Sequence, residues 1–173
     1  FIGLLFVTLY TIISTSTPLR IMPNWCRNRV TVFGEPEEIA KVTKIFKDEK
    51  SIFDNIIKSP DWRRLPNMKG EYSKLEQHKN PKTGEVIFET YNFPDGKNDD
   101  RWYDWNITNW GTKWDITVKS VEFGYEDSEQ LEMEFETAWA PPEPICNRLR
   151  EMFEDLTISW FYDEPGMQVA GYL

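Results

Sequence analysis

Apolar residues recur along the chain with two different spacings, and each spacing predicts one kind of secondary structure. The stretch RVTVFG, residues 29–34, alternates and ends in glycine, which predicts a short strand. EPEEIAKVTKIFKDE follows, and its apolar residues have helical spacing behind Pro36, a residue that favours the first turn of a helix. The first regular unit is therefore predicted to be a strand followed by a helix.

The last third of the chain shows the same two spacings. DITVKSVEFGYED predicts one strand, and LEMEFETAW predicts another because its apolar residues alternate with Glu132, Glu134 and Glu136. The link 124–130 between these strands predicts a hairpin. APPEPICNRLREMFEDL predicts a helix opened by prolines, and TISWFY and MQVAGYL predict two closing strands around the turn DEPG.

The region 51–100 interrupts this regularity. FDNIIKSPDWRRLP is a compact, partly apolar stretch, whereas NMKGEYSKLEQHKNPKTGEV is polar and carries the glycine and proline signals of a surface excursion. VIFETYNFPDGKNDD has room for a short strand before another turn. The one histidine of the chain, His78, falls in the polar stretch, so we expect it to be solvated in a loop.

The order of these elements predicts an α+β fold of the ferredoxin-like, split βαβ type. It reads strand, helix, insertion, two strands, helix, strand and an added terminal strand. Two helices are expected to cover one face of an antiparallel sheet and to leave the other face open. Residues 22–173 then form one domain, with a helical and loop insertion at about 51–115 after the first helix.

The stretch YDWNITNWGTKWD, residues 103–115, is rich in tryptophan and lies in this insertion. Residues 101–110 are expected to form a helix that is capped within 98–100 and ended by Gly111. Helical spacing then places four of its apolar side chains on one stripe. The residues of this stripe are Tyr103, Ile107, Trp110 and Trp114.

This stripe supports two interpretations. In the structural one, the stripe packs the inserted helix against the main core. In the functional one, Lys113 and Asn109 line a pocket with a tryptophan floor, where a cation–π contact or amide hydrogen bonds orient a ligand. Trp139, in the TAW sequence, is expected to border the same pocket.

The first 21 residues differ from the rest of the chain. FIGLLFVTLYTII is apolar, but its 13 residues fall short of the about 20 that span a bilayer. It has the length of a signal-peptide core, yet lacks a basic segment before it and a small-residue cleavage site. Residues 1–21 are therefore interpreted as sequence upstream of a start at Met22, or as a disordered or hydrophobic leader. Either way, we expect them to be dispensable.

Charge and cysteine content narrow the classes of partner and compartment. The chain carries 20 basic and 29 acidic residues, a net charge of −9. Nucleic acid is an improbable partner for such a chain, because phosphate binding depends on Lys and Arg, whereas a partner with a basic surface suits it. Cys26 and Cys146 lack metal-ligand spacing and favour a reducing cytoplasm.

A run of acidic side chains suggests a charged platform on the open face of the sheet. The segment 121–147 holds eight acidic residues and no basic one. The glutamates of LEMEFETAW are expected to share the outer face with two arginines of the first strand. They either form cross-strand ion pairs on a solvated face, or form an acidic platform that binds a basic partner or imitates a phosphate backbone. The platform consists of Arg27, Arg29, Glu132, Glu134 and Glu136.

The motifs of common enzymes and metal sites do not occur in the sequence. It holds no glycine-rich phosphate loop, no HExxH, no nucleophile elbow and no Cys/His cluster. Asp99, Asp100 and Asp104 could gather around a divalent metal, but acids at a helix start more often serve the helix itself. We therefore expect no catalytic residues, no metal ligands and no cofactor.

Five stretches, in order and spacing, carry a family resemblance: MPNWCRNRVTVFG, FDNII, NWGTKWD, FETAWAPPEPI and YDEPGMQVAGY. They resemble the YubB-like ferredoxin-domain proteins of bacteriophages and plasmids, a family also called Api92-like. The resemblance covers residues 22–173 apart from 67–100. It implies a ferredoxin-like domain, a mobile-element origin and MPNWC as a natural N-terminus. It implies no catalytic residues.

Three functions remain after these observations. The leading one is a non-enzymatic phage or plasmid accessory protein that binds a host bacterial protein with a basic surface in the cytoplasm. The second is an RNA-recognition-like module that stacks single-stranded bases, although Phe33 is the one aromatic residue placed on the open face. The third is an enzyme of unrecognised type with a pocket between NWGTKWD and TAW. The candidate surface comprises Asn109, Lys113, Trp114, Trp139, Arg27, Arg29, Glu132, Glu134 and Glu136.

Overall fold

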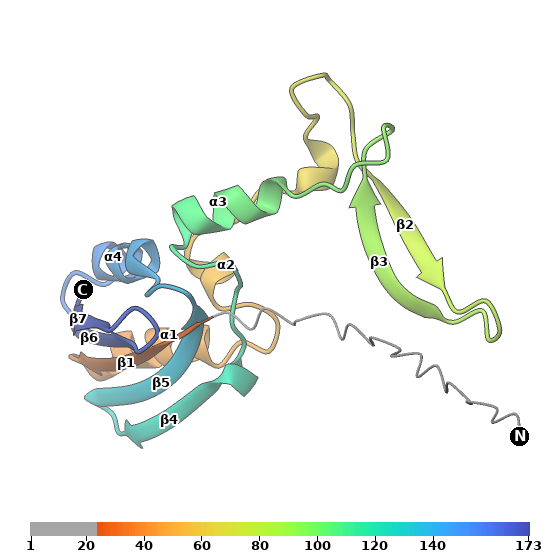
Figure 1. Cartoon of the computed structure of the whole chain (residues 1–173). Coiled ribbons are helices and arrows are strands. Elements are labelled where there is room, and N and C mark those ends of the chain that lie inside the picture. Colours follow the sequence, from red (N-terminus) through yellow and green to blue (C-terminus); the bar gives the residue numbers. More distant parts are fainter. Residues whose placement is uncertain (1–23) are drawn as a thin grey trace, which may run out of the picture.

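Figure 1 shows the protein as a computed structural model that describes residues 24–173. Its main body is a five-stranded antiparallel sheet with the strand order β4-β5-β1-β6-β7. The central strand β1 (Trp25–Phe33) pairs with β5 (Gln130–Ala138) on one side and with β6 (Thr157–Glu164) on the other. The outer strands are β4 (Val121–Glu126) and β7 (Val169–Tyr172). The prediction for residues 1–21 lies outside the described residues.

The connections between these strands confirm the predicted ferredoxin-like α+β class. Helix α1 (Pro36–Phe46) follows β1, and helix α4 (Glu143–Met152) joins β5 to β6. Pro36 occupies the start of α1, as expected from its fixed backbone angle. Both helices lie on the same side of the sheet (Figure 1), where their apolar residues join the core cluster. The added strand β7 extends the sheet beyond β6.

Alternation along the strands decides which face of the sheet is buried. In β1, Val30 and Val32 face the helices and are buried, while the residues between them face outward. Strand β5 follows the same rule, with Leu131, Met133 and Phe135 in the core. A one-residue slip in either strand would expose this whole set, so the apolar pattern also specifies the register.

Asn28 lies inside this core, where its amide is fully bonded. Its Nδ2 donates to the carbonyl of Cys26 at 3.0 Å and to Thr137 Oγ1 at 2.9 Å. Its Oδ1 accepts the indole N–H of Trp160 at 3.1 Å. These bonds join β1, β5 and β6 across the centre of the sheet. Alternation alone gives no sign that a polar side chain occupies this inward position.

The insertion contains a second sheet that the sequence does not clearly predict. Strands β2 (Lys74–Lys79) and β3 (Val86–Asn92) pair as an antiparallel hairpin and project away from the main body (Figure 1). His78 therefore belongs to a strand instead of a loop, and its ring stacks on Phe88 with centroids 4.2 Å apart. Almost every residue of both strands is exposed or half-exposed, so the hairpin lacks a buried face that would mark it in the sequence. We call residues 67–97 the hairpin arm.

Short helices connect the arm to the body. They are α2 (Phe53–Ile56), the 3-10 turn Trp62–Arg64, α3 (Arg101–Asn109) and the 3-10 turn Val118–Ser120.

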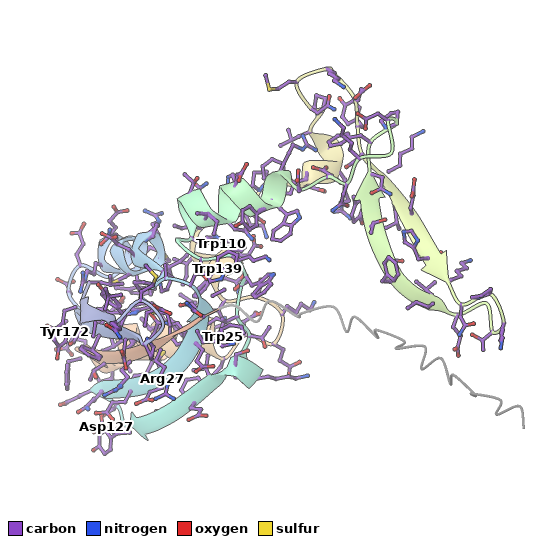
Figure 2. All side chains as sticks on the ribbon, in the orientation of Figure 1. Trp25, Arg27, Trp110, Asp127, Trp139 and Tyr172 are labelled. Carbon is purple, nitrogen blue, oxygen red and sulfur yellow. The ribbon has the colours of Figure 1, made fainter. Side chains whose placement is uncertain are left out.

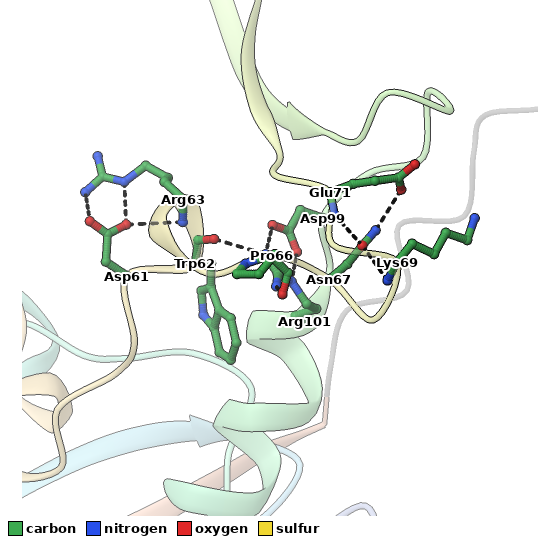
Figure 3. A network of polar contacts seen from close by, with 9 residues as sticks. All are labelled: Asp61, Trp62, Arg63, Pro66, Asn67, Lys69, Glu71, Asp99 and Arg101. Carbon is green, nitrogen blue, oxygen red and sulfur yellow. Dashed lines mark hydrogen bonds and ion pairs between the residues drawn. The ribbon is translucent and has the colours of Figure 1, made fainter.

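Arg101 ties the base of the arm to helix α3 (Figure 3). Its Nε and Nη2 atoms donate to the two carboxylate oxygens of Asp99, each at 2.8 Å. Its Nη1 donates to the carbonyl of Pro66 and its Nη2 to that of Trp62, both at 3.0 Å. The guanidinium also lies over the rings of Trp62 and Phe93, 5.3 and 5.2 Å from their centroids. The rigid fork of one arginine thus holds both chain segments at the base of the arm.

Helix α3 ends as predicted, but its apolar stripe does not pack as predicted. Gly111 has a φ of 80° just past the helix, the left-handed conformation expected for a residue that ends it. Trp110 is buried, whereas Ile107 and Trp114 are 38% and 40% exposed, so the docked stripe is wrong for these two residues. For Trp114 the physical reason is the turn at Gly111, which takes it off the helix axis, whereas Ile107 lies within α3 on a side that is not buried against the core. Trp105 packs against the core in their place.

No helix within residues 24–173 combines the length and the apolar character needed to cross a membrane.

Candidate binding surface

The open face of the sheet is hollowed into a groove of about 850 Å³. Its floor is the outer face of β1 and β5, and its wall is the chain segment 114–120 before β4. We call it the sheet groove. The side chains that line it include Trp25, Arg27, Arg29, Trp114, Lys119, Glu122, Glu134 and Glu136.

The predicted arginine and glutamate partners meet on this floor. Arg27 lies opposite Glu136 and Arg29 opposite Glu134 in the register of β1 and β5, with a separation of 3.8 Å in each ion pair. All four side chains are more than half exposed. Pairs with this separation and exposure contribute no more than about 1 kcal/mol each to folding stability. Their charges therefore remain available to a partner.

Acidic charge exceeds basic charge along the same row of the sheet. Glu122 of β4 lies directly opposite Glu134, which places two like charges next to each other. On its other side, Glu134 lies opposite Arg29 of β1. The row of Glu122, Glu134 and Arg29 therefore holds two acidic side chains and one basic side chain. Glu132 faces Thr31 and accepts a hydrogen bond from Gln130 Nε2 at 2.8 Å. Within this row negative charge therefore exceeds positive charge, while Arg27 and Lys119 are the other cations of the groove.

Two tryptophans border one end of the groove. Trp25 lies beyond Arg27 on the outer face of β1 (Figure 2), and Trp114 lies beside it with ring centroids 6.1 Å apart. Their exposed fractions are 41% and 40%, which is high for the largest apolar side chain. Trp25 was missed as a site residue, although its spacing of two from Arg27 places it on the same face.

Lys113 lies among three aromatic rings next to this end. Its Nζ is 4.5 Å from the ring centroid of Trp114, 5.2 Å from that of Trp139 and 5.6 Å from that of Tyr103. We call these four residues the Lys113 cluster. The structure thus brings Lys113, Trp114 and Trp139 together. Asn109 is separate from this cluster, because its Nδ2 donates back to the carbonyl of Trp105 on its own helix at 2.9 Å.

Trp139 reaches this position with a strained backbone. Its φ is 69°, a left-handed value that costs a bulky residue about 1–2 kcal/mol. Hydrogen bonds on either side hold it there. Thr112 Oγ1 donates to the carbonyl of Ala138 at 3.0 Å, and Thr137 Oγ1 donates to that of Ala140 at 2.8 Å. Strain of this kind persists where the surrounding structure fixes a residue, and it is common at binding sites.

The β6–β7 side of the open face carries further aromatic rings. Phe161 and Tyr172 pack edge to face with centroids 5.2 Å apart. The guanidinium of Arg29 lies 5.3 Å from the ring centroid of Phe161. Phe33, at the end of β1, is exposed as predicted. The sequence placed one aromatic residue on this face, whereas the register of β6 and β7 adds two more.

Asp115, the acid beside the Lys113 cluster, has a structural role. Its Oδ1 accepts the backbone N–H groups of Ile52, Phe53 and Ile116 at 3.0, 2.7 and 2.7 Å, and its Oδ2 accepts that of Asp54 at 3.0 Å. Burial raises the pKa of its carboxyl despite these bonds. Because the bonds hold both oxygens against the start of α2, Asp115 caps that helix and is poorly placed for acid–base chemistry.

The other chemically reactive side chains are also engaged in the structure. Asp99 pairs with Arg101, which holds the pKa of its carboxyl below the usual range. Cys26 and Cys146 are buried as free thiols, and burial raises the pKa of Cys26 to about 11, far from the range of a reactive cysteine. Within residues 24–173, no three His, Cys, Asp or Glu side chains are arranged to hold a metal ion.

The strand order, the two covering helices and the open face define a ferredoxin-like α+β protein. Residues 109–173 match the family model described as the ferredoxin-like domain in Api92-like protein. The resemblance drawn from the sequence motifs is confirmed for this part of the chain. The matched segment 109–173 contains β4 to β7, Lys113, Trp139 and the glutamates of the groove.

One solved structure matches a larger share of the chain. It is the crystal structure of the protein api92 from Yersinia pseudotuberculosis, with 13% sequence identity and a TM-score of 0.48. The match covers 87% of this chain and 93% of that one. A comparison with curated protein sequences gave no match.

Proposed function

We propose that this domain is a non-enzymatic binding module whose sheet groove holds a basic peptide segment of another protein. The observation that carries the proposal is the row formed by Glu122, Glu134 and Arg29, in which one cation serves two neighbouring glutamates. A lysine or arginine of a partner, placed over Glu122 and Glu134, would relieve their repulsion. In the setting that the sequence resemblance implies, the partner is a host bacterial protein and the module is a phage or plasmid accessory protein of the cytoplasm.

The shape and chemistry of the groove support a peptide as its occupant. An extended chain can lie along the floor of the sheet, where charged side chains reach outward from both strands. At one end, Trp25 and Trp114 offer exposed rings that suit an apolar or cationic side chain. Interfaces commonly combine such aromatic anchors with a charged rim that selects the partner. The net charge of −9 further attracts a basic partner at a distance.

Fluorescence anisotropy with short labelled peptides tests the proposal. One peptide is rich in lysine and arginine around a single leucine, and its counterpart replaces every basic residue with glutamate. We expect the basic peptide alone to bind, with an affinity that falls as salt is added. The double substitution Glu122→Gln and Glu134→Gln should weaken binding about tenfold or more, which corresponds to about 1.4 kcal/mol.

The matched control removes the same amount of charge from the other face of the protein. Glu37 and Glu154 are exposed on the helix side of the sheet, in or next to α1 and α4. Glu37→Gln with Glu154→Gln should leave peptide binding nearly unchanged. Equal binding of both peptides, or equal loss of binding in both double variants, would contradict a site in the groove.

A second candidate function is supported by the β6–β7 side of the same face. Phe33, Phe161 and Tyr172 there are rings on which single-stranded bases can stack. Anisotropy with labelled oligothymidine and oligouridine at low salt tests this function. Micromolar binding that is lost in the double variant Phe161→Ala and Tyr172→Ala would favour it over peptide binding. The surrounding glutamates and the acidic chain argue for the peptide.

A further inference from the structure

The Lys113 cluster holds its ammonium group in an unusual environment. Among residues 24–173, no carboxylate forms an ion pair with Lys113. Its neighbours are instead the rings of Tyr103, Trp114 and Trp139, at 4.5 to 5.6 Å from Nζ to the ring centroids. Three rings around one cation form an aromatic cage, the arrangement that binds alkylammonium groups.

We propose that this cage is a receptor site for an alkylammonium group from outside the domain, and that Lys113 occupies it in the free protein as an internal substitute. The ligand group is the ammonium of a lysine side chain, its methylated form or a small quaternary amine. All three carry a positively charged nitrogen bonded to at least one methylene or methyl group, and these carbon groups pack against the ring faces. Tryptophan, which supplies two of the three rings, has the strongest cation-binding face of the aromatic residues.

Several features of the cage point to an exchangeable cation. Trp114 and Trp139 are 40% and 36% exposed, so the site opens to solvent. In the described part of the chain, residues 24–173, no hydrogen bond or ion pair restrains the Nζ of Lys113, so this long side chain can move away without breaking a polar contact. The ring of Trp139 lies at this point although its backbone has a left-handed φ, a kind of strain that is common at functional sites.

The position of the cage connects it to the sheet groove. Trp114 contributes to both, and Ala138 lines the groove as well as a smaller, separate pocket that Tyr103 and Trp139 also line. If a basic peptide lies in the groove, as proposed above, one of its cationic side chains can enter the cage at the end. The cage itself is tested with small cations, so a failure of this idea is distinguishable from a failure of peptide binding.

Titration with tetramethylammonium chloride, against sodium chloride at equal ionic strength, tests the cage. Its binding is followed by tryptophan fluorescence and by the indole N–H resonances. The variant Lys113→Ala empties the cage, and we expect it to bind the cation about tenfold or more tightly than the wild type does, because no internal lysine competes. The matched control Lys44→Ala removes an equal charge from the exposed surface of α1, away from the groove, and should behave as the wild type. Adding Trp139→Ala to Lys113→Ala should abolish the binding.

The wild type provides a second measurement that needs no folded variant. The ring currents should shift the Lys113 side-chain methylene resonances upfield, and added tetramethylammonium should return them toward the values of a free lysine. A peptide with one trimethyl-lysine, its unmodified counterpart and choline then distinguish a partner side chain from a free amine. The inference is overturned if Lys113→Ala shows no saturable response, if Lys44→Ala shows the same gain, or if the Lys113 resonances are unshifted.

Discussion

The main body and the hairpin arm use the same antiparallel backbone pairing but differ in what covers it. Strand β1 of the body alternates between buried and exposed residues, and α1 and α4 cover its inner face. Strand β2 of the arm has no fully buried residue. Backbone hydrogen bonds alone leave a two-stranded hairpin marginal in water. The comparison shows that stability in this protein resides in the covered face of the body, while the arm depends on its base.

Local contacts shape the arm but add little burial. Asn67 organises one of its loops, because its Oδ1 accepts the N–H groups of Lys69 and Glu71 at 2.9 and 3.0 Å (Figure 3). Ile87 and Phe88 of β3 remain 62% and 53% exposed. The anchor formed by Arg101 is therefore the main tertiary connection of the arm, and it can be weakened without affecting the core.

The largest expected effect comes from the same substitution made in both regions. Leu131 is fully buried in β5, and Leu75 is 45% exposed in β2. Leu131→Ala should lower the free energy of unfolding by about 2–5 kcal/mol, because it leaves a cavity in the core. Leu75→Ala should change it by no more than about 0.5 kcal/mol. Urea denaturation followed by tryptophan fluorescence measures both. Similar losses in the two variants would show that the arm is part of the same cooperative core.

Loss of the anchor should affect the arm more than the body. Arg101→Ala leaves the buried carboxylate of Asp99 without its bidentate partner, so opening of the arm base should become easier by about 1.5–3 kcal/mol. Amide hydrogen exchange should accelerate in β2 and β3 and stay slow in β1 and β5. Arg101→Lys, which keeps the charge and loses the planar fork, should give an intermediate result. Equal acceleration across both sheets would contradict a separate anchor.

A fall in pH should change local stability in opposite directions at the base of the arm, where Asp99 lies, and at the start of α2, where Asp115 lies. Arg101 lowers the pKa of Asp99, so the stabilising contribution of this carboxylate is complete above the ordinary aspartate value of about 3.9 and is lost as pH falls through the lower folded value. Burial raises the pKa of Asp115, so the native state binds that proton first, and stability near α2 declines as pH rises from about 3.9 through the folded value.

Amide exchange measured across this pH range should therefore show the arm base loosening at the acid end. The variant Asp99→Asn removes the titrating group and should make the exchange of β2 and β3 independent of pH after correction for the intrinsic rate. Asp104→Asn, on the exposed side of α3, serves as the control. Persistence of the pH dependence in Asp99→Asn would assign it to another group.

Replacement of the arm should have the smallest effect on the body. A short glycine–serine linker in place of residues 68–97 removes the ring of Phe93 but keeps Trp62, Pro66, Asp99 and Arg101, and therefore the hydrogen bonds of the anchor. We expect the free energy of unfolding to change by no more than about 1 kcal/mol, because the closure entropy of a loop varies slowly with its length. Thermal and urea unfolding of the shortened chain check this expectation. Aggregation or a much larger loss would mean that the arm covers part of the core.

The sequence determined the elements whose burial is periodic. The alternation in LEMEFETAW placed Leu131 and Met133 inside and the glutamates outside, and the spacing after Pro36 located helix α1. Because a strand residue and its partner point to the same face, the sequence also brought Arg29 next to Glu134. In each of these cases the spacing of apolar residues within one segment indicates which of its faces packs against the core.

The tertiary structure decided the features that lack such a repeat. The arm has no buried face, so its strands carry no alternation that could separate them from a loop. The Lys113 cluster draws residues from α3, from the segment after Gly111 and from the end of β5, and no spacing within one segment encodes that meeting. The spacing of apolar residues within one segment indicates which of them are buried. Which distant surface side chains come together depends instead on how the packed elements position the turns between them.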